Sequence, residues 1–115
     1  MIYLASPYSS PIKDLEHQRF QRAEAFVAHC FRNGVWVFSP IVYAHMMAKK
    51  HSLPTDAAPW IAFNTQMLRI AEAVFVLHLP RWEESKGVAL ELKMASMLQI
   101  PIAHWDADFN PIVGN

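Results

Sequence analysis

Short apolar segments that favour β-strands alternate along this chain with longer segments of helical periodicity. The clearest predicted strand is Ala73–Leu79 (AVFVLHL), and the others are Met1–Ala5, Val35–Phe38 and Gln99–His104. Strands that are apolar on both faces are typical of a parallel sheet covered by helices on each side. A length of 115 residues suits one domain. We therefore predict a single α/β domain over residues 1–115, with helices on both faces of a parallel sheet.

The helical segments show apolar residues at steps of three and four. The predicted helices are Ile12–Asn33, Ile41–His51, Ala58–Ala71 and a last one from Ser85 to about Leu98. A break is predicted at Ser52–Asp56, and the sequence leaves open whether Ile41–Asp56 forms a lid. The tail from Asp106 has no clear pattern and is predicted to be irregular.

The charge balance excludes some classes of partner. Ten Lys and Arg residues balance ten Asp and Glu residues, and no basic block stands out. The charge distribution therefore gives no indication that a nucleic-acid polymer is a partner. One local site for a small anion is still compatible with it. The N-terminus lacks the pattern of a signal peptide, and no segment has the ~20 apolar residues of a membrane span. We predict a cytoplasmic protein with no membrane partner.

The cysteine and the histidines do not favour thiol or metal chemistry. Cys30 is the single cysteine, so no internal disulfide can form, which fits a reducing compartment. Its apolar helical setting favours a buried structural thiol over a nucleophile. The six histidines lack the HxxxH and HExxH spacings of metal sites. We expect no metal and no cofactor.

The loops that follow the first three predicted strands are expected to share one rim of the sheet, where ligands of open α/β sheets bind. These loops are Ser6–Ser10, Ser39–Ile41 and Pro80–Ser85. The first is either a simple turn or a site loop, because it offers hydroxyls and amides but too few glycines for a phosphate-loop motif. Trp60 and Trp82 either pack in the core or stack on a base, and the rim position favours Trp82.

Glu91 is the most unusual residue of the last helix. At about 100° per residue it falls inside an apolar stripe that includes Val88 and Ala95. One interpretation is a carboxylate that reaches solvent or pairs with an arginine. The other is a functional carboxylate, because burying an unpaired charge costs several kcal/mol and this part of the helix lies at the predicted ligand rim.

The start of the same helix adds weight to the functional interpretation. Ser85 is a plausible N-cap, which alone would explain it. Gly87 lowers helix stability by ~1 kcal/mol relative to alanine, and its lack of a side chain lets a ligand approach the backbone. Gly87 and Glu91 lie on adjacent turns of one face, so a ligand over Gly87 would meet Glu91. Free amides at the helix start would suit a phosphate.

Arg19 shows a similar anomaly in the first long helix, where it projects on the apolar side. Its stem could pack at the edge of the core with the guanidinium in solvent. It could also bind a phosphate or carboxylate, or pair with Glu91. The sequence leaves these alternatives open.

From Ile2 to Ile102, the chain resembles the nucleoside 2-deoxyribosyltransferase-like superfamily, and most closely its small bacterial and phage members. The resemblance rests on the ordered segments YLASPYS, the helix with Arg19, a strand ending in Ser39-Pro40, VFVLHL, and WEESKGVALELKMASMLQIPI. The most specific part is the spacing Ser85-x-Gly87-x-x-x-Glu91, which related nucleotide N-glycosidases share.

The resemblance implies a flavodoxin-like or Rossmann-like three-layer sandwich. It also implies that Glu91 attacks the anomeric carbon of a nucleoside or nucleoside 5′-monophosphate, so that the base leaves and a glycosyl-enzyme ester forms. A transferase passes the sugar to another base, and a hydrolase passes it to water. Tyr3, or Tyr8, would orient the nucleophile or the sugar. Members commonly form homodimers or larger assemblies.

In this comparison, Ser85 and Gly87 match residues that bind the 5′ end of the substrate. The predicted catalytic residues are Glu91 and Tyr3. The predicted substrate-binding residues are Ser6, Tyr8, Arg19, Ser39, Asn64, Trp82, Ser85 and Gly87. The predicted partner is therefore a small-molecule nucleoside or nucleotide.

One departure keeps other functions open. The superfamily usually has an aspartate in the helix before the third strand, and the best match here is Asn64, whose amide is a poor general acid. Asp56 does not align with that role. A non-catalytic nucleotide-binding module is therefore an alternative. In a third interpretation the chain is a structural, self-associating domain in which Glu91 and Arg19 form a buried pair.

Overall fold

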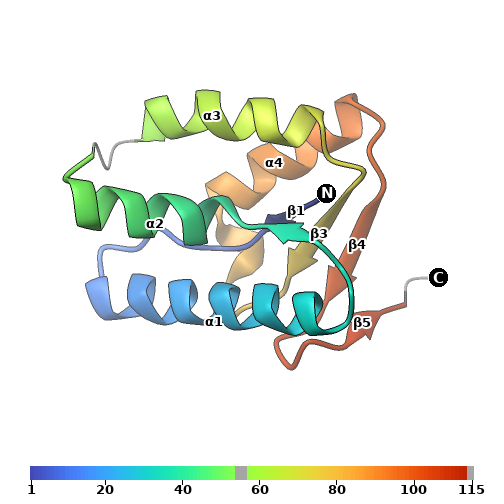
Figure 1. The fold of residues 1–115 in the computed structure, drawn as a ribbon, viewed down its shortest axis with the longest axis horizontal. Coiled ribbons are helices and arrows are strands. Elements are labelled where there is room, and N and C mark those ends of the chain that lie inside the picture. Colours follow the sequence, from blue (N-terminus) through green and yellow to red (C-terminus); the bar gives the residue numbers. More distant parts are fainter. Residues whose placement is uncertain (54–56, 114–115) are drawn as a thin grey trace.

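The computed structural model describes residues 1–53 and 57–113, so part of the predicted break at Ser52–Asp56 lies outside the described residues. Among these residues, five strands form one sheet in the order β2-β1-β3-β4-β5 (Figure 1). The strands are β1 (Ile2–Ala5), β2 (Val37–Phe38), β3 (Ala73–Leu77), β4 (Ile102–Trp105) and β5 (Pro111–Ile112). The first four pair in parallel, and β5 pairs antiparallel with β4. This 2-1-3-4-5 order is that of flavodoxin-like folds.

The described helices cover both faces of the sheet, which confirms the predicted three-layer α/β sandwich (Figure 1). Helix α1 (Lys13–Arg32) packs on one face, and α3 (Ala57–Arg69) and α4 (Lys86–Met97) cover the other. Helix α2 (Pro40–His51) lies against α1 at the side of β1 and β2. The search for membrane spans finds no described helix that is long and apolar enough to cross a bilayer.

The alternation of side chains along β1 divides the core into two parts. Tyr3 and Ala5 point to the face of α3 and α4, where they pack with Leu68 and Val88. Leu4 points to the opposite face, where the α1 residues Ala23, Phe26 and Cys30 cover it. The buried position of Cys30 agrees with a structural thiol, and burial raises its pKa. The same alternation places Tyr3 on the side of the sheet where α4 runs.

Two predicted strands are shorter than their apolar runs. Strand β3 ends at Leu77 because the N–H of Leu79 donates to the Leu77 carbonyl (2.9 Å), which turns the chain. Strand β2 starts at Val37 because the N–H of Val35 still donates to Cys30 O at the end of α1 (2.9 Å). Hydrogen bonds of turns and helix ends therefore override β-propensity at these positions.

The segments on either side of β4 also differ from the prediction. Gln99 adopts a left-handed backbone (φ 58°) as the chain leaves α4, so β4 starts at Ile102. The tail is not irregular throughout: Asp106 Oδ1 accepts the N–H groups of Asp108 and Asn110 (2.9 and 3.0 Å), and this turn returns the chain as β5. The predicted parallel sheet therefore carries one antiparallel edge strand.

Candidate active site

A cavity of about 650 Å³ lies beyond the carboxyl end of β1, between α2, α3 and the start of α4. This is the rim at which the sequence predicted a ligand site. Among the residues that line the cavity are seven of the predicted site residues: Tyr3, Ser6, Tyr8, Asn64, Ser85, Gly87 and Glu91. A volume of this size is within the range of small-molecule sites.

Local structure explains how Glu91 reaches this cavity. Ser85 caps α4, because its Oγ accepts the N–H of Val88 (3.2 Å). Glu91 follows in the second turn, on the same face as Val88, which is buried against the sheet. The Tyr3 hydroxyl, which projects from β1 toward α4, donates a hydrogen bond to Glu91 Oε2. The first strand and the last helix thus hold one carboxylate at the cavity wall.

The surroundings of this pair shift both pKa values. Desolvation raises the pKa of Glu91 from 4.5 to about 7, and the hydrogen bond from Tyr3 opposes this shift. Burial, followed by the charge of Glu91 and the hydrogen bond to it, raises the pKa of Tyr3 far above its usual value. Tyr3 therefore stays a proton donor at neutral pH, while a larger fraction of Glu91 is protonated than of an exposed carboxyl.

Gly87 leaves the cavity wall open beside Glu91. Outside the backbone of α4 itself and the two neighbouring residues, a β-carbon added at Gly87 would have one described atom within 4 Å. This atom is Ser85 Oγ, at 3.8 Å. Such a methyl group would therefore occupy cavity space and would not clash with the described protein. The geometry agrees with the prediction that the glycine lets a ligand approach the helix start.

Two polar groups of the cavity lack a hydrogen-bond partner among the described residues. They are the hydroxyl of Ser6 and the side-chain oxygen of Asn64, both of which are buried. A buried polar atom without a partner loses about 1–3 kcal/mol relative to a satisfied one. The Ser6 hydroxyl can therefore donate or accept a hydrogen bond with a bound molecule, and the Asn64 oxygen can accept one.

Arg19 does not line the cavity and does not pair with Glu91. Its guanidinium is buried and donates to the carbonyls of Tyr8 (3.3 Å), Ser9 (3.0 Å) and Pro80 (3.5 Å). These bonds tie the loop after β1 to the loop after β3. The structure corrects both the interpretation of a guanidinium in solvent and that of a Glu91–Arg19 pair, because the guanidinium is buried and its two terminal nitrogens donate to backbone carbonyls.

Ser39 and Trp82 also lie outside the cavity wall, although sequence analysis placed them in the site. Ser39 caps α2 by accepting the N–H of Val42 (3.1 Å). Trp82, in the short 3-10 helix η1 (Trp82–Glu84), stacks on His78 with ring centroids 4.0 Å apart. The tryptophan that lines the cavity is Trp60 of α3.

Several residues of the cavity were not predicted as site residues, and His45 and Lys86 are two of them. His45 of α2 lines it and forms a hydrogen bond with the Tyr8 hydroxyl through Nδ1 (2.6 Å). Lys86, in the first turn of α4, also lines it. Only the proximity of Lys86 to Ser85 and Gly87 could have indicated its position, and no sequence signal singles out His45.

The part of the chain that the structure describes contains no cluster of metal-binding side chains. No group of three or more His, Cys, Asp or Glu side chains is arranged there to hold an ion.

Two solved structures share the fold of the chain. One is a 2-deoxyribosyltransferase from the psychrotolerant bacterium Bacillus psychrosaccharolyticus, with a TM-score of 0.57 and 22% identity over 98% of this chain and 76% of that one. The other is a 2-deoxyribosyltransferase from Leishmania mexicana, with a TM-score of 0.55 and 21% identity over 91% of this chain and 63% of that one. The likeness confirms the predicted resemblance at the level of the fold.

The sequence comparisons define the family. No curated protein sequence matches the chain. The family described as "Domain of unknown function (DUF1937)" matches residues 1–107, which is nearly the whole chain. The chain therefore belongs to the DUF1937 family, whose fold in this protein is that of the 2-deoxyribosyltransferases.

Proposed function

We propose that this protein cleaves the N-glycosidic bond of a nucleoside or nucleoside 5′-monophosphate, with Glu91 as the nucleophile. The observation that carries the proposal is the Glu91 carboxylate, which lies in the wall of a cavity of about 650 Å³ and accepts a hydrogen bond from Tyr3. The fold shared with 2-deoxyribosyltransferases supports the same class of reaction.

In the proposed reaction, a Glu91 oxygen attacks the anomeric carbon while the bond from that carbon to the base nitrogen breaks. The electron pair of this bond leaves with the base, which takes a proton from water or a nearby donor. A glycosyl ester of Glu91 remains, and water or a second base then attacks the same carbon and frees the carboxylate. A desolvated carboxylate is well suited to this role, because less hydration has to be removed before attack.

The other cavity residues are proposed to bind the substrate. Tyr3 orients the carboxylate, and Ser6 and Asn64 offer unpartnered polar atoms to the sugar or base. Ser85 and Gly87 form the start of α4, where amides and the helix dipole favour a 5′-phosphate. Arg19, Ser39 and Trp82 are proposed to act indirectly, by fixing the loops that surround the cavity.

Asn64 favours a second candidate function, that of a nucleotide-binding module without turnover. An amide can hydrogen-bond a base, but it cannot supply a proton to a leaving base at neutral pH. The same cavity would then bind a nucleotide and leave it intact. The homo-oligomeric state and the cytoplasmic location stay predictions in either case.

The test is a base-release assay with a panel of ribo- and deoxyribonucleoside 5′-monophosphates and the matching nucleosides, each with and without an acceptor base. Chromatography resolves free base from substrate. Release that depends on the protein would support a glycosidase or transferase and identify the substrate. Absence of release, together with a raised melting temperature in the presence of a nucleotide, would favour the binding module.

Tyr3→Phe should lower the rate of base release at pH 7 by roughly tenfold, because the hydrogen bond from Tyr3 holds the pKa of Glu91 down. Without this bond a smaller fraction of Glu91 is ionised at pH 7. The acidic limb of the pH–rate profile should therefore move to higher pH, and activity should recover in part at pH 8–9.

The matched control is Tyr43→Phe, which removes a hydroxyl from an exposed tyrosine of α2. This variant should keep the wild-type profile. An unchanged profile in Tyr3→Phe would mean that the hydroxyl does not tune Glu91.

A further inference from the structure

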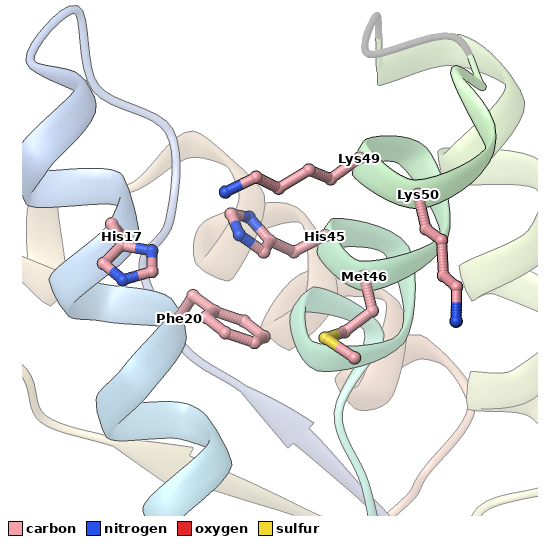
Figure 2. A pocket seen from close by; sticks show the side chains of 6 residues that line it. All are labelled: His17, Phe20, His45, Met46, Lys49 and Lys50. Carbon is pink, nitrogen blue, oxygen red and sulfur yellow. The ribbon is translucent and has the colours of Figure 1, made fainter.

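A second, smaller cavity of about 210 Å³ lies between α1 and α2. We call it the α1–α2 cleft, and Figure 2 shows the side chains that line it: His17, Phe20, His45, Met46, Lys49 and Lys50. Since a water molecule takes about 30 Å³ in the liquid, the cleft has room for an anion of a few heavy atoms. Neither the proposed reaction nor the family description assigns a role to it.

The polar lining of the cleft is basic. Four of its six lining residues carry a positive charge or can take one, and none of these described residues is acidic. Figure 2 shows Lys49 extending over His45 toward His17, whereas the Lys50 amino group points to the other side. Lysines in the last turn of a helix often serve only to offset its dipole. That explanation does not account for His17, which faces them from α1.

Glu16 is the acidic residue whose charge acts on His45, and its carboxylate already accepts hydrogen bonds from other groups. Glu16 precedes His17 on α1, and its two carboxylate oxygens accept from Lys13 Nζ (3.3 Å) and from the N–H of Ser10 (3.1 Å). The pKa of His45 is lowered by burial first, and then by the charges of Lys49 and His17, with Glu16 acting in the opposite direction. Glu16 therefore acts on His45 through its charge, while both of its oxygens already have donors of their own.

The ring of His45 separates the cleft from the larger cavity. It stacks on Phe20 with ring centroids 4.1 Å apart, which fixes its plane. Its Nδ1 is hydrogen-bonded to the hydroxyl of Tyr8, and both residues line the larger cavity. An anion in the cleft would thus lie next to a residue that also lines the larger cavity.

We propose that the α1–α2 cleft binds a phosphate group, held by the ammonium of Lys49 and the imidazoles of His17 and His45, with Lys50 at its rim. Three donors on two helices can surround a tetrahedral oxyanion, and the ammonium of Lys49 would offset part of its charge. The phosphate is either inorganic or part of a phosphomonoester whose remainder lies in the larger cavity. This assignment does not depend on the proposed reaction, because phosphate binding needs no turnover.

The test is calorimetric titration of the protein with sodium phosphate at pH 7 and constant ionic strength. The wild type should show saturable binding. Lys49→Ala and His17→Ala should each weaken it at least tenfold, because each removes a donor to the anion. Lys93→Ala, which removes an exposed lysine from α4 on another face, should bind within twofold of the wild type.

Two further arms identify the source of the phosphate. Competition between phosphate and a nucleoside 5′-monophosphate, together with weaker binding of the nucleotide by Lys49→Ala, would place the phosphate of the nucleotide in the cleft and not at the start of α4. Simultaneous binding of both would assign the cleft to a free anion. Absence of saturable binding by the wild type, or equal affinity in Lys49→Ala and the wild type, would overturn the proposal, whatever the base-release assay gives.

Discussion

Glu91→Gln should abolish base release, with a loss of at least about 1,000-fold, which corresponds to roughly 4 kcal/mol of transition-state stabilisation. The amide keeps the size of the side chain and can still accept the hydrogen bond of Tyr3. It has no anionic oxygen with which to form a glycosyl ester. The variant should therefore fold and retain ligand binding while the chemical step is lost.

The matched control is Glu24→Gln, which neutralises an exposed carboxylate of α1 far from the cavity lining. Its rate of base release should equal that of the wild type. Ligand binding is checked through the rise in melting temperature with saturating nucleotide. If Glu91→Gln released base at a rate near that of the wild type, Glu91 would not be the nucleophile.

The burial of Glu91 should also make the stability of the protein depend on pH. The pKa of this carboxyl is about 7 in the folded state and about 4.5 when exposed, so the folded state binds the proton more tightly. The resulting stabilisation is fully present below about pH 4.5 and is lost as the pH rises to about 7. The contribution is up to about 3 kcal/mol over this interval.

Urea unfolding of the wild type and of Glu91→Gln at several pH values between 4.5 and 8 measures this effect. The stability of the variant relative to the wild type should increase across the interval. The comparison is necessary because burial lowers the pKa of His45 and His78, and these groups change stability in the opposite direction. A constant difference between the two proteins would show that Glu91 titrates normally.

The fold was predictable because its signals are local. The apolar runs and helical periods indicate the order of strands and helices, and the same periodicity places Glu91 among apolar neighbours. The loops after β1 and β3 could be assigned to one rim from topology alone. The start of a helix could be predicted where a side chain caps the backbone that follows it, as Ser85 does for α4.

The composition of the cavity wall was less predictable, because it depends on how elements distant in sequence pack together. The periodicity of α2 does not show which of its faces lines the cavity, so nothing in the sequence indicated that His45 belongs to the cavity wall. The choice between Trp60 and Trp82 depends on the partner of each ring, and Trp82 stacks on His78. Arg19 was anomalous in the sequence, but its carbonyl partners lie on two loops that only the tertiary structure joins.

The bond between Tyr3 and Glu91 has a consequence for folding. Its two residues are 88 positions apart, so the bond links the first strand, β1, to the last described helix, α4. A truncated chain that lacks α4 would leave the hydroxyl of Tyr3 without this carboxylate, and would have to bury or expose it unpaired. The bond therefore forms only when β1 and α4 have come together in the folded domain.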